Sequence, residues 1–594
     1  MSGPNLIVPN AGVGESYRLQ TDNNGVLNVR IEDAPPIPIF NQIAPLGTGA
    51  DDWPRLIAFI NARVALGPIE MLPGVWHADS DVMDLPSGTV LYASPGVTII
   101  ANLPFLPGGP PNSVFRVPLT TDPPNLTTIT ADTVIGGTTI ALTDITHFPD
   151  GTHIILAGGA DVAGFYRIVS HVANVVTVDR PILRAYPVAT SNVVPVTSFG
   201  SNVQLYGRGA LITGQANRAI EMVAASDCIA DDWRMTGTFG DAVVSMDVPS
   251  LRCRMRKLDI QTVVGGGVFG MGMESCEDCS YTECYVRNTG PAGGDGIGMH
   301  SCLQCLVDNC TVEGFQLGCV LFIEVISTQA WAACVGNTIR NCKFTSNSNW
   351  GIAALDYANH NFFTECIGTT NGFGLFTQQQ NAIYSRCENL VSVNDPRAVS
   401  VTSGYVTIQG WRSSFTGVNT YVLNSDGSRV ELSDFLIELG GGGCVGIGTS
   451  GATPSFLRAT NGRIVPGVTF GDISAAVGTN GTGEFDLVDI TGGYIGFFST
   501  SASSKLRAYR TTDASNNPYY ANVAGTVSRG TFQLNGATPV VVPFIGIRAD
   551  DQIAIEKTIN VGGGTAPVIT ITAGTGFTAT GVAGDTSTYA WRTI

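Results

Sequence analysis

The chain has 594 residues, of which 44% are hydrophobic, 72 are glycine and only 13% are charged. This balance is typical of a β-rich protein with many tight turns, in which short side chains replace the charged faces of helices. The net charge of −17 disfavours nucleic acid and anionic membrane surfaces as partners, because basic residues supply most of the affinity for phosphate.

The N-terminal sequence MSGPNLIVPNAGVGES has no basic region followed by an apolar core, so no secretory signal is expected. No apolar run is long enough to cross a bilayer, and membrane insertion is not expected either. We therefore expect a soluble protein made in a cytosol, whose fourteen cysteines are free buried thiols by default.

The beginning of the chain predicts an arm followed by the covered end of a solenoid. Residues 1–44 contain Gly, Asn and a Pro-Pro-Ile-Pro run, which indicates an extended arm. Within residues 45–118, the apolar stretch Leu56–Ile60 predicts a short helix, and the segments around Leu72-Pro73-Gly74 and Leu85–Val90 predict the first strands. A helix here would cover the first coil, which otherwise exposes strand edges and apolar core.

Residues 119–200 have a different pattern, an alternation rich in Thr and Val such as Val175–Val178. They lack the cysteine spacing of the segment that follows. We predict an inserted β subdomain between early coils, and the alternative is a run of degenerate coils.

Residues 201–515 contain the repeat that predicts the fold. The stretch Ser275–Cys284 is matched 26 residues later by Ser301–Cys310, and an apolar-x-polar-Cys pattern then continues. One cysteine recurs per coil, at intervals of 26, 32, 24 and 21 residues, namely Cys284, Cys310, Cys342, Cys366 and Cys387. The predicted fold class is all-β, a right-handed single-stranded parallel β-helix, with Val307, Cys310 and Val312 inside each coil and Asn309 at a turn.

The paired cysteines Cys276-x-x-Cys279 and Cys302-x-x-Cys305 imitate the spacing of zinc ligands. Equivalent positions in neighbouring coils would lie about 4.8 Å apart, in rows rather than in a tetrahedron. That separation also exceeds the Cβ distance of about 3.8 Å in a disulfide. We expect cysteines that fill the core as small apolar side chains, rather than zinc ligands or disulfides, and we expect no metal and no cofactor.

Residues 526–594 predict a C-terminal β-sandwich, because short alternating strands such as Val540–Phe544 and Val568–Ile571 are separated by Gly and Pro. A sandwich shared between chains would cover the apolar core of the last coil. This favours a homotrimer.

The sequence resembles the tailspikes and tail appendages of bacteriophages, which belong to the pectate-lyase-like β-helix superfamily. The resemblance depends on Gly47-Thr-Gly-Ala-Asp51-Asp52 with the following helix, on Leu72-Pro73-Gly74, and on the tail from Ala573 to Trp591, which is similar to a C-terminal module of phage virion proteins. It implies a homotrimeric virion protein, assembled in the host cytoplasm, that binds a bacterial surface glycan such as capsule, O-antigen or exopolysaccharide. Residues 1–44 would then dock into another tail or adaptor protein.

Cleavage of a glycan requires carboxyl groups, either as an acid–base pair or as a single base. The candidates in the best repeated coils are Asp295, Glu324, Asp356 and Glu274, together with His300. The 26-residue register places Glu274 level with His300, and Glu324 and Asp356 would follow on the same face, where stacking would raise the carboxyl pKa values. The alternative is that these acids are solvated surface residues and that His300 lies at a turn.

Aromatic residues are crowded between residues 331 and 376, and sugar rings stack on exposed aromatic faces. The candidate glycan contacts are Trp350, Tyr357 and Trp331. Others in the region, Phe363 above all, must fill the core.

These features support three hypotheses. The first is a phage tailspike that recognises and depolymerises a surface polysaccharide. The second is a non-catalytic virion fibre in which the β-helix is a spacer, and the third is a secreted polysaccharide lyase, which the missing signal disfavours.

Overall fold

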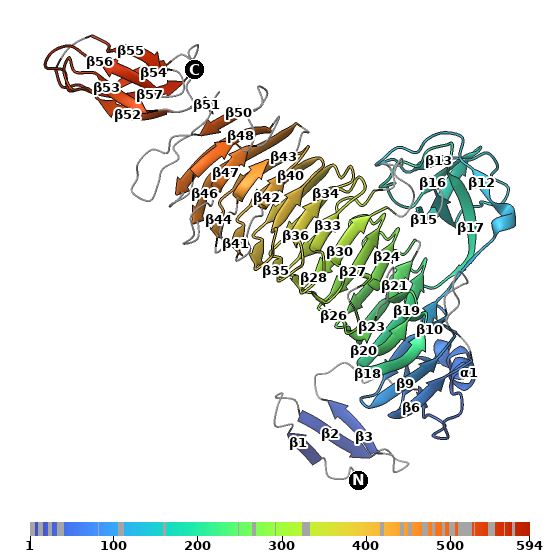
Figure 1. The fold of residues 1–594 in the computed structure, drawn as a ribbon. Helices are drawn as coiled ribbons and strands as arrows, with labels where there is room; N and C mark the ends of the chain where they lie inside the picture. The colour runs from blue at the N-terminus through green and yellow to red at the C-terminus, as the bar shows by residue number, and fades with distance from the viewer. Residues whose placement is uncertain are drawn as a thin grey trace.

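A computed structural model describes residues 6–9, 16–21, 27–31, 41–80, 82–104, 112–158, 162–247, 249–263, 269–291, 293–323, 333–415, 421–439, 445–449, 454–465, 473–477, 481–489, 494–497, 505–508, 526–527, 529–543, 553–562, 565–572 and 576–593. Its central part is a parallel β-solenoid, which confirms the predicted fold class (Figure 1). None of the helices in these ranges is long and apolar enough to span a membrane.

Each complete coil contributes one strand to each of three faces, and each strand pairs in parallel with its equivalent one coil later. The first face contains β22 Arg254–Arg256, β25 Ser280–Thr282, β28 Leu306–Asp308, β31 Thr338–Arg340, β34 Asn359–Thr364, β37 Tyr384–Glu388, β40 Tyr405–Gln409 and β43 Arg429–Ser433. The second face contains β23 Asp259–Val263, β26 Tyr285–Asn288, β29 Thr311–Glu313, β32 Lys343–Thr345, β35 Ile367–Thr369, β38 Val391–Val393, β41 Arg412–Phe415 and β44 Leu436–Leu439.

The third face is a fourteen-stranded sheet. Its strands are β7 Met83–Asp84, β10 Ser113–Val117, β19 Arg218–Val223, β21 Ala242–Asp247, β24 Phe269–Glu274, β27 Asp295–His300, β30 Leu317–Phe322, β33 Trp350–Ala354, β36 Gly374–Gln378, β39 Val399–Val401, β42 Tyr421–Ser425, β45 Val445–Thr449, β47 Ile473–Val477 and β49 Tyr494–Phe497.

The remaining solenoid strands belong to the first and last coils. They are β4 Asn41–Ile43, β5 Ile69–Met71, β6 Gly74–Ala78, β8 Val90–Ala93, β9 Val97–Asn102, the long strands β18 Gln204–Ala216, β20 Ile229–Phe239, β46 Ser455–Val465 and β48 Gly481–Asp489, and finally β50 Lys505–Ala508 and β51 Thr526–Val527.

A short helix covers the first coils, as the apolar pattern predicts. Helix α1 (Trp53–Arg63) is followed by the 3-10 turn η1 (Val64–Leu66). Its residues Trp53, Leu56 and Ile60 are buried and belong to the same hydrophobic core as the coils, and the indole of Trp53 donates a hydrogen bond to the carbonyl of Val114. The helix therefore shields apolar core that a first coil would otherwise expose.

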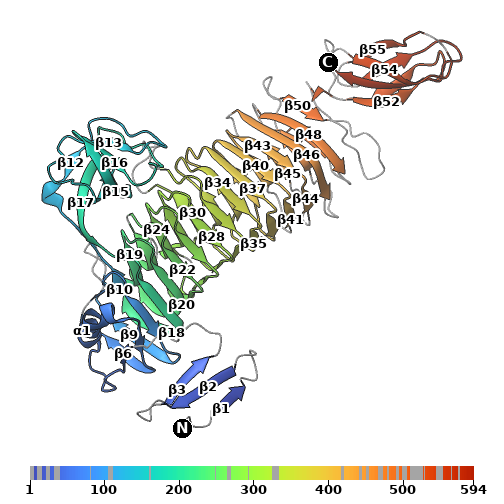
Figure 2. The same ribbon diagram turned by 180° about the vertical axis from the view of Figure 1, so that it is seen from behind.

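The chain leaves the solenoid after β10 to form an antiparallel subdomain with its own hydrophobic core. Its elements are β11 Leu119–Thr121, η2 Pro123–Asn125, β12 Thr127–Thr128, β13 Thr139–Ala141, β14 His153–Ala157, β15 Ala163–Val172, β16 Val175–Val178 and β17 Asn192–Phe199. Strands before and after this insertion pair directly, β8 and β9 with β18 and β10 with β19. Figure 2 shows the subdomain at one side of the stacked coils.

Buried polar contacts attach the inserted subdomain to the corner between the third and first faces. The guanidinium of Arg180 forms an ion pair with Glu277 at 2.8 Å and lies 4.5 Å from the centre of the Tyr166 ring. The backbone N–H of Ala163 donates to Ser275 Oγ at 3.2 Å, and the buried guanidinium of Arg184 donates to the carbonyl of Ser301. Because these groups are withdrawn from water, the subdomain is held at one defined position.

Three small sheets lie outside the solenoid and the inserted subdomain. Residues 529–593 form a sandwich of β52 Arg529–Gln533, β57 Thr588–Thr593 and β54 Ile553–Ile559 on β53 Val540–Pro543, β56 Gly576–Thr580 and β55 Val568–Thr572. Phe532, Phe577, Tyr589 and Trp591 fill the space between its sheets. Within residues 1–44, the antiparallel strands β1 Leu6–Pro9, β2 Ser16–Thr21 and β3 Leu27–Ile31 form a sheet that the expected extended arm did not include, and β4 already belongs to the solenoid.

The cysteines lie in the core, as the repeat predicts. All thirteen described cysteines are free and buried, and Val307, Cys310 and Val312 are at most 1% exposed. Asn309 has a left-handed φ of 53° at the turn between β28 and β29. Burial raises the pKa of Cys387, so the reactive thiolate is disfavoured.

Buried amide side chains form a second row along the coils. Asn347 Nδ2 donates to Asn371 Oδ1 at 2.9 Å, and Asn371 Nδ2 donates to Asp395 Oδ1 at 3.1 Å. Among the described residues the last member of this row is Asp395, which also accepts from the Asn371 backbone at 2.7 Å and from Ser392 Oγ at 2.7 Å. Burial raises the pKa of Asp395, and these hydrogen bonds oppose that rise.

The burial of the cysteines predicts their reactivity. In the native protein we expect at most one thiol per chain, Cys444, which lies outside the described residues, to react rapidly with a disulfide reagent. In denaturant all fourteen should react. Titration with the reagent checks this, and fast native labelling of several thiols would contradict the buried rows.

The amide row predicts opposite effects for two substitutions of Asp395. Asp395→Asn keeps an acceptor for Asn371 and removes a buried charge, so the denaturation midpoint at neutral pH should stay equal or rise. Asp395→Ala leaves two donors of Asn371 without their acceptor and should cost about 1–3 kcal/mol per unsatisfied group. Chemical denaturation followed by circular dichroism measures both, and equal losses in the two variants would contradict this account.

Candidate functional site

The outer side of the third face carries the sequence-predicted residues that the structure describes. In β24, β27 and β30 the side chains of Met273, Met299 and Leu321 enter the core. Their neighbours at the end of each strand, Glu274, His300 and Phe322, therefore form an outward row, and Glu274 pairs with His300 as the 26-residue register predicts.

Three rings of this face are in mutual contact. The ring centres of His300 and Phe322 are 3.8 Å apart, and that of Phe269 lies 4.9 Å from His300 at an interplanar angle of 81°. A Cβ at Gly298 would lie 2.5 Å from the Phe269 ring, so the absence of a side chain there lets the ring lie across β27. We call Phe269, His300 and Phe322 the aromatic platform.

Asp295 begins β27 on the same face. Its backbone neighbours in the adjacent coils are the apolar residues Phe269 and Leu317. Burial raises the pKa of Asp295 to about 6, and a backbone hydrogen bond at Leu317 opposes this rise. A carboxyl group with such a pKa is still partly protonated near neutral pH, and it can therefore act as a general acid.

The described candidates fall into two groups at opposite ends of the strands. Asp295 and His300 are the first and last residues of one strand, five residue steps apart, which is about 16 Å at roughly 3.3 Å per residue. Glu274 and His300 lie at the far end, and Asp356 follows the end of β33 on that side. Burial raises the pKa of Asp356 as it does that of Asp295, so desolvation rather than repulsion between stacked carboxylates is the cause.

The aromatic candidates have different surroundings. Trp350 is only 6% exposed and stacks with Phe373 at 6.1 Å, and Phe373 is the ring of this pair that faces solvent, with 51% exposure. Tyr357 has a left-handed φ of 62° and packs against Val162 of the inserted subdomain and Ile323. Glu324 and Trp331 lie outside the described residues.

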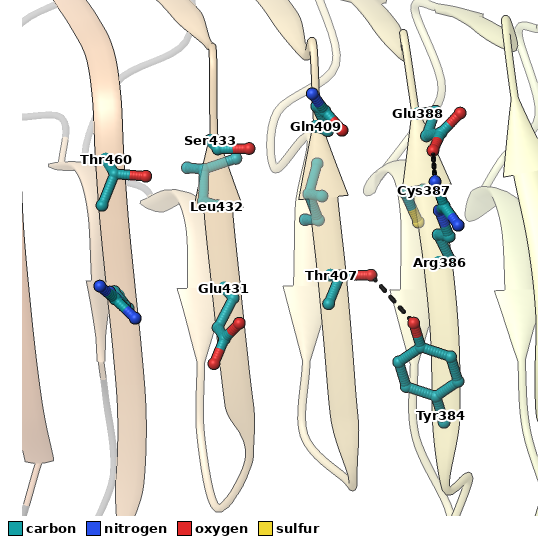
Figure 3. Close-up of a pocket in the computed structure, with 12 residues that line it drawn as sticks. Tyr384, Arg386, Cys387, Glu388, Thr407, Gln409, Glu431, Leu432, Ser433 and Thr460 are labelled. Atoms are coloured by element: carbon teal, nitrogen blue, oxygen red, sulfur yellow. Dashed lines mark hydrogen bonds and ion pairs between the residues drawn. The ribbon is translucent and has the colours of Figure 1, made fainter.

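The sequence did not predict a cavity of about 400 Å³ on the first face, lined by residues of β37, β40, β43 and β46 (Figure 3). The residues that line it are Tyr384, Arg386, Cys387, Glu388, Thr407, Ile408, Gln409, Glu431, Leu432, Ser433, Arg458 and Thr460. No motif marks them, because they become neighbours only through the register of four successive coils. Alternation with the buried Val406, Ile408 and Leu432 is the one signal that could have indicated an outward row here.

No family model matches the sequence, and no curated protein matches it. Among solved structures, the chain is similar to the tailspike protein gp49 from Pseudomonas phage LKA1, with 15% identity, a TM-score of 0.47 and coverage of 91% of this chain and 92% of that one. It is also similar to the gp54 tailspike of Acinetobacter baumannii bacteriophage AP22, a structure in complex with A. baumannii capsular saccharide, with 10% identity, a TM-score of 0.46 and coverage of 92% and 93%. A third structure is the A-module of the Azotobacter vinelandii mannuronan C-5 epimerase AlgE6, with 11% identity, a TM-score of 0.36 and coverage of 79% and 97%. Because these sequence identities and TM-scores are low, the function of this chain must be inferred from its own side chains.

The raised pKa of Asp295 predicts a gain in stability when its charge is removed. A carboxyl whose pKa is higher in the folded than in the unfolded chain lowers the free energy of unfolding once it ionises, so this cost appears as the pH rises from about 4 to about 6. Asp295→Asn should therefore be more stable than the wild type at pH 7, by on the order of 1–3 kcal/mol. At pH 4 the two proteins should be alike. Denaturation at both pH values checks this, and a variant that is less stable at pH 7 would contradict it.

Proposed function

We propose that this chain is a receptor-binding tailspike of a bacteriophage virion that binds and cleaves a bacterial surface polysaccharide on the third face of its solenoid. The observation that carries the proposal is a half-buried Asp295, whose carboxyl pKa is raised to about 6, on the same face as the aromatic platform, of which Phe269 pairs with Asp295 and reaches His300 at the other end of the strand. Aromatic ring faces bind the apolar faces of sugars, and a protonated carboxyl can supply the proton that cleavage requires. The resemblance of the sequence to phage tailspikes supports the place of the protein in a virion tail.

The chemistry assigned to Asp295 is the same for hydrolysis and for elimination. In hydrolysis the bond from the anomeric carbon to the glycosidic oxygen breaks, and water adds to that carbon and gives up a proton to solvent. In elimination the C4–O bond of a uronic acid unit breaks while a proton leaves C5 and a double bond forms. In both reactions the leaving oxygen takes up a proton. Asp295 donates that proton and becomes a carboxylate, which the solvent protonates again before the next cycle. Burial of the carboxyl group keeps a fraction of it protonated near neutral pH, and this fraction can act as the acid.

The proposal also includes self-association and attachment to the virion. Val541 and Val568 are 63% and 68% exposed and lie on the two outer strands of one sheet of the C-terminal sandwich, where a second copy of the chain could cover them. In this arrangement the sandwich joins the copies of a homotrimer, and residues 1–44 bind another tail or adaptor protein.

Replacement of Asp295 by Asn tests the cleavage step. Asparagine cannot donate the proton, so Asp295→Asn should lower the rate of polysaccharide shortening by at least ~100-fold and leave polysaccharide binding within about threefold of the wild type. Size-exclusion chromatography of capsular polysaccharide and O-antigen preparations measures shortening, and near-ultraviolet absorption of an unsaturated product distinguishes elimination from hydrolysis.

Phe373→Ala serves as a control, because it removes an exposed ring without touching Asp295. It should retain most of the cleavage activity. Equal cleavage by the wild type and Asp295→Asn would exclude Asp295 as the acid. A wild-type protein that binds polysaccharide without shortening it would favour the non-catalytic virion fibre.

A further inference from the structure

The cavity on the first face is built from outward side chains that lie in three parallel rows. One row is Tyr384, Tyr405, Arg429 and Phe456, the next is Arg386, Thr407, Glu431 and Arg458, and the third is Glu388, Gln409, Ser433 and Thr460. Between them, Val406, Ile408 and Leu432 point into the core. Thr407 and Ser433 are short, whereas Arg386 and Arg458 at the two ends of the middle row are long. The difference in length leaves a trough across β40 and β43 (Figure 3).

The first row forms a continuous wall of rings and one guanidinium along the trough. The ring centres of Tyr384 and Tyr405 are 5.3 Å apart. The guanidinium carbon of Arg429 lies 5.2 Å from the centre of the Tyr405 ring and 5.0 Å from that of Phe456. These contacts hold flat, partly exposed surfaces at successive coils, about 4.8 Å apart. Successive units of an extended ligand can each contact one of these surfaces.

The polar groups of the trough are held in fixed positions and fixed protonation states. Tyr405 donates to Glu431 at 2.9 Å, and the hydroxyls of Tyr384 and Thr407 are 3.2 Å apart. The hydrogen-bonded Arg429 lowers the pKa of Glu431, and burial together with the bond to Glu431 raises the pKa of Tyr405 to about 12. Neither group changes its protonation near neutral pH, so the trough offers fixed donors and acceptors but no proton donor of the kind found at Asp295.

The charges of the lining are balanced. Among the residues that line the cavity, Arg386 and Arg458 balance Glu388 and Glu431. Arg386 forms an ion pair with Glu388, and Arg429, which flanks the cavity, forms one with Glu431. In a chain with a net charge of −17, a polyanionic ligand would be repelled by the rest of the surface and would find the guanidiniums of both pairs already neutralised. Uncharged hydroxyl groups can bridge the carboxylate and guanidinium edges, and Gln409, Ser433 and Thr460 provide further hydrogen-bonding groups.

We propose that this trough is a second carbohydrate-binding site that holds an uncharged stretch of an oligosaccharide without cleaving it. It shares no residue with the platform around Asp295, which lies on another face and in earlier coils. The inference rests on the proposed function for its ligand class, but it adds a site that retains the polysaccharide while the third face cleaves it. One chain therefore binds two segments of glycan.

The test fills the trough and counts bound glycan. Thr407→Trp places a large ring in the middle of the trough at a half-buried position. Thr338→Trp is the matched control, because Thr338 occupies the same row three coils earlier, is half-buried as well, and lies outside the cavity. The probes are an array of bacterial capsular polysaccharides and O-antigens, followed by isothermal titration with size-fractionated fragments of the polysaccharide that binds. Circular dichroism verifies the fold of each variant.

We expect two fragments per chain for the wild type and for Thr338→Trp, and one for Thr407→Trp, with at least a tenfold loss of affinity for the whole polysaccharide. The Thr407→Trp protein should still shorten the polysaccharide at saturating concentration. The difference between the two variants should be the same at low and at high salt, since the ligand is uncharged at this site.

Equal stoichiometry and affinity in the two Trp variants would overturn the second site and leave the proposed function standing. A difference that disappears at high salt would overturn the uncharged ligand class. Loss of shortening in Asp295→Asn with unchanged binding would support cleavage on the third face and would not bear on the second site. Absence of any bound polysaccharide in the wild type would overturn both the proposed function and the second site.

Discussion

Parallel pairing of each strand with its equivalent one coil later is the interaction on which the rest of the structure depends. It places equivalent residues about 4.8 Å apart in rows that run the length of the solenoid. Each member of a row lies beside the next, so side chains of one kind can stack along the solenoid. Thiols stack on thiols in the core, and Asn347 stacks on Asn371, which stacks on Asp395. On the third face the ring of His300 packs on that of Phe322 in the next coil, and the ring of Phe269 reaches His300 from the other end of the strand. Outside the core, the same pairing brings the outward side chains of successive coils into line on flat surfaces.

The sequence predicts those parts of the structure that depend on local alternation and on the strongest repeat. The cysteine rows, the turn at Asn309 and the pairing of Glu274 with His300 all follow from the 26-residue spacing, and the cap follows from the apolar pattern at Leu56–Ile60. The first-face cavity could not be predicted, because its strands begin at intervals that vary with the lengths of the intervening turns. To predict that Asp295 lies at the opposite end of the strand from His300, one must know where the strand begins and ends. To predict that Trp350 is buried under Phe373, one must know how neighbouring coils pack.

The two surfaces divide two chemical tasks between different environments. Asp295 is desolvated, so a fraction of its carboxyl groups keeps a proton for donation near neutral pH. Glu431 is surrounded by an arginine and a phenol, so its charge is fixed and serves only as an acceptor. The strands that flank Asp295 belong to the coils before and after it, whereas Glu431 is held by Arg429 of its own strand and by Tyr405 of the preceding coil. A stiff solenoid keeps such sites at a constant separation, which suits a polymer that contacts several coils at once.

The insertion of residues 119–200 within a coil has a consequence for folding. Tyr92 of β8 pairs with Tyr206 of β18, and their rings stack at 4.8 Å, although the whole subdomain lies between them in the chain. Contacts between the other coils join residues close in sequence. The contacts between β8 and β18 instead require a long loop to close first. We therefore expect nucleation among the cysteine-rich coils, and growth of the stack toward both ends. The helical cap would then dock last on the N-terminal side, after the subdomain has folded and brought β9 and β10 within reach of β18 and β19.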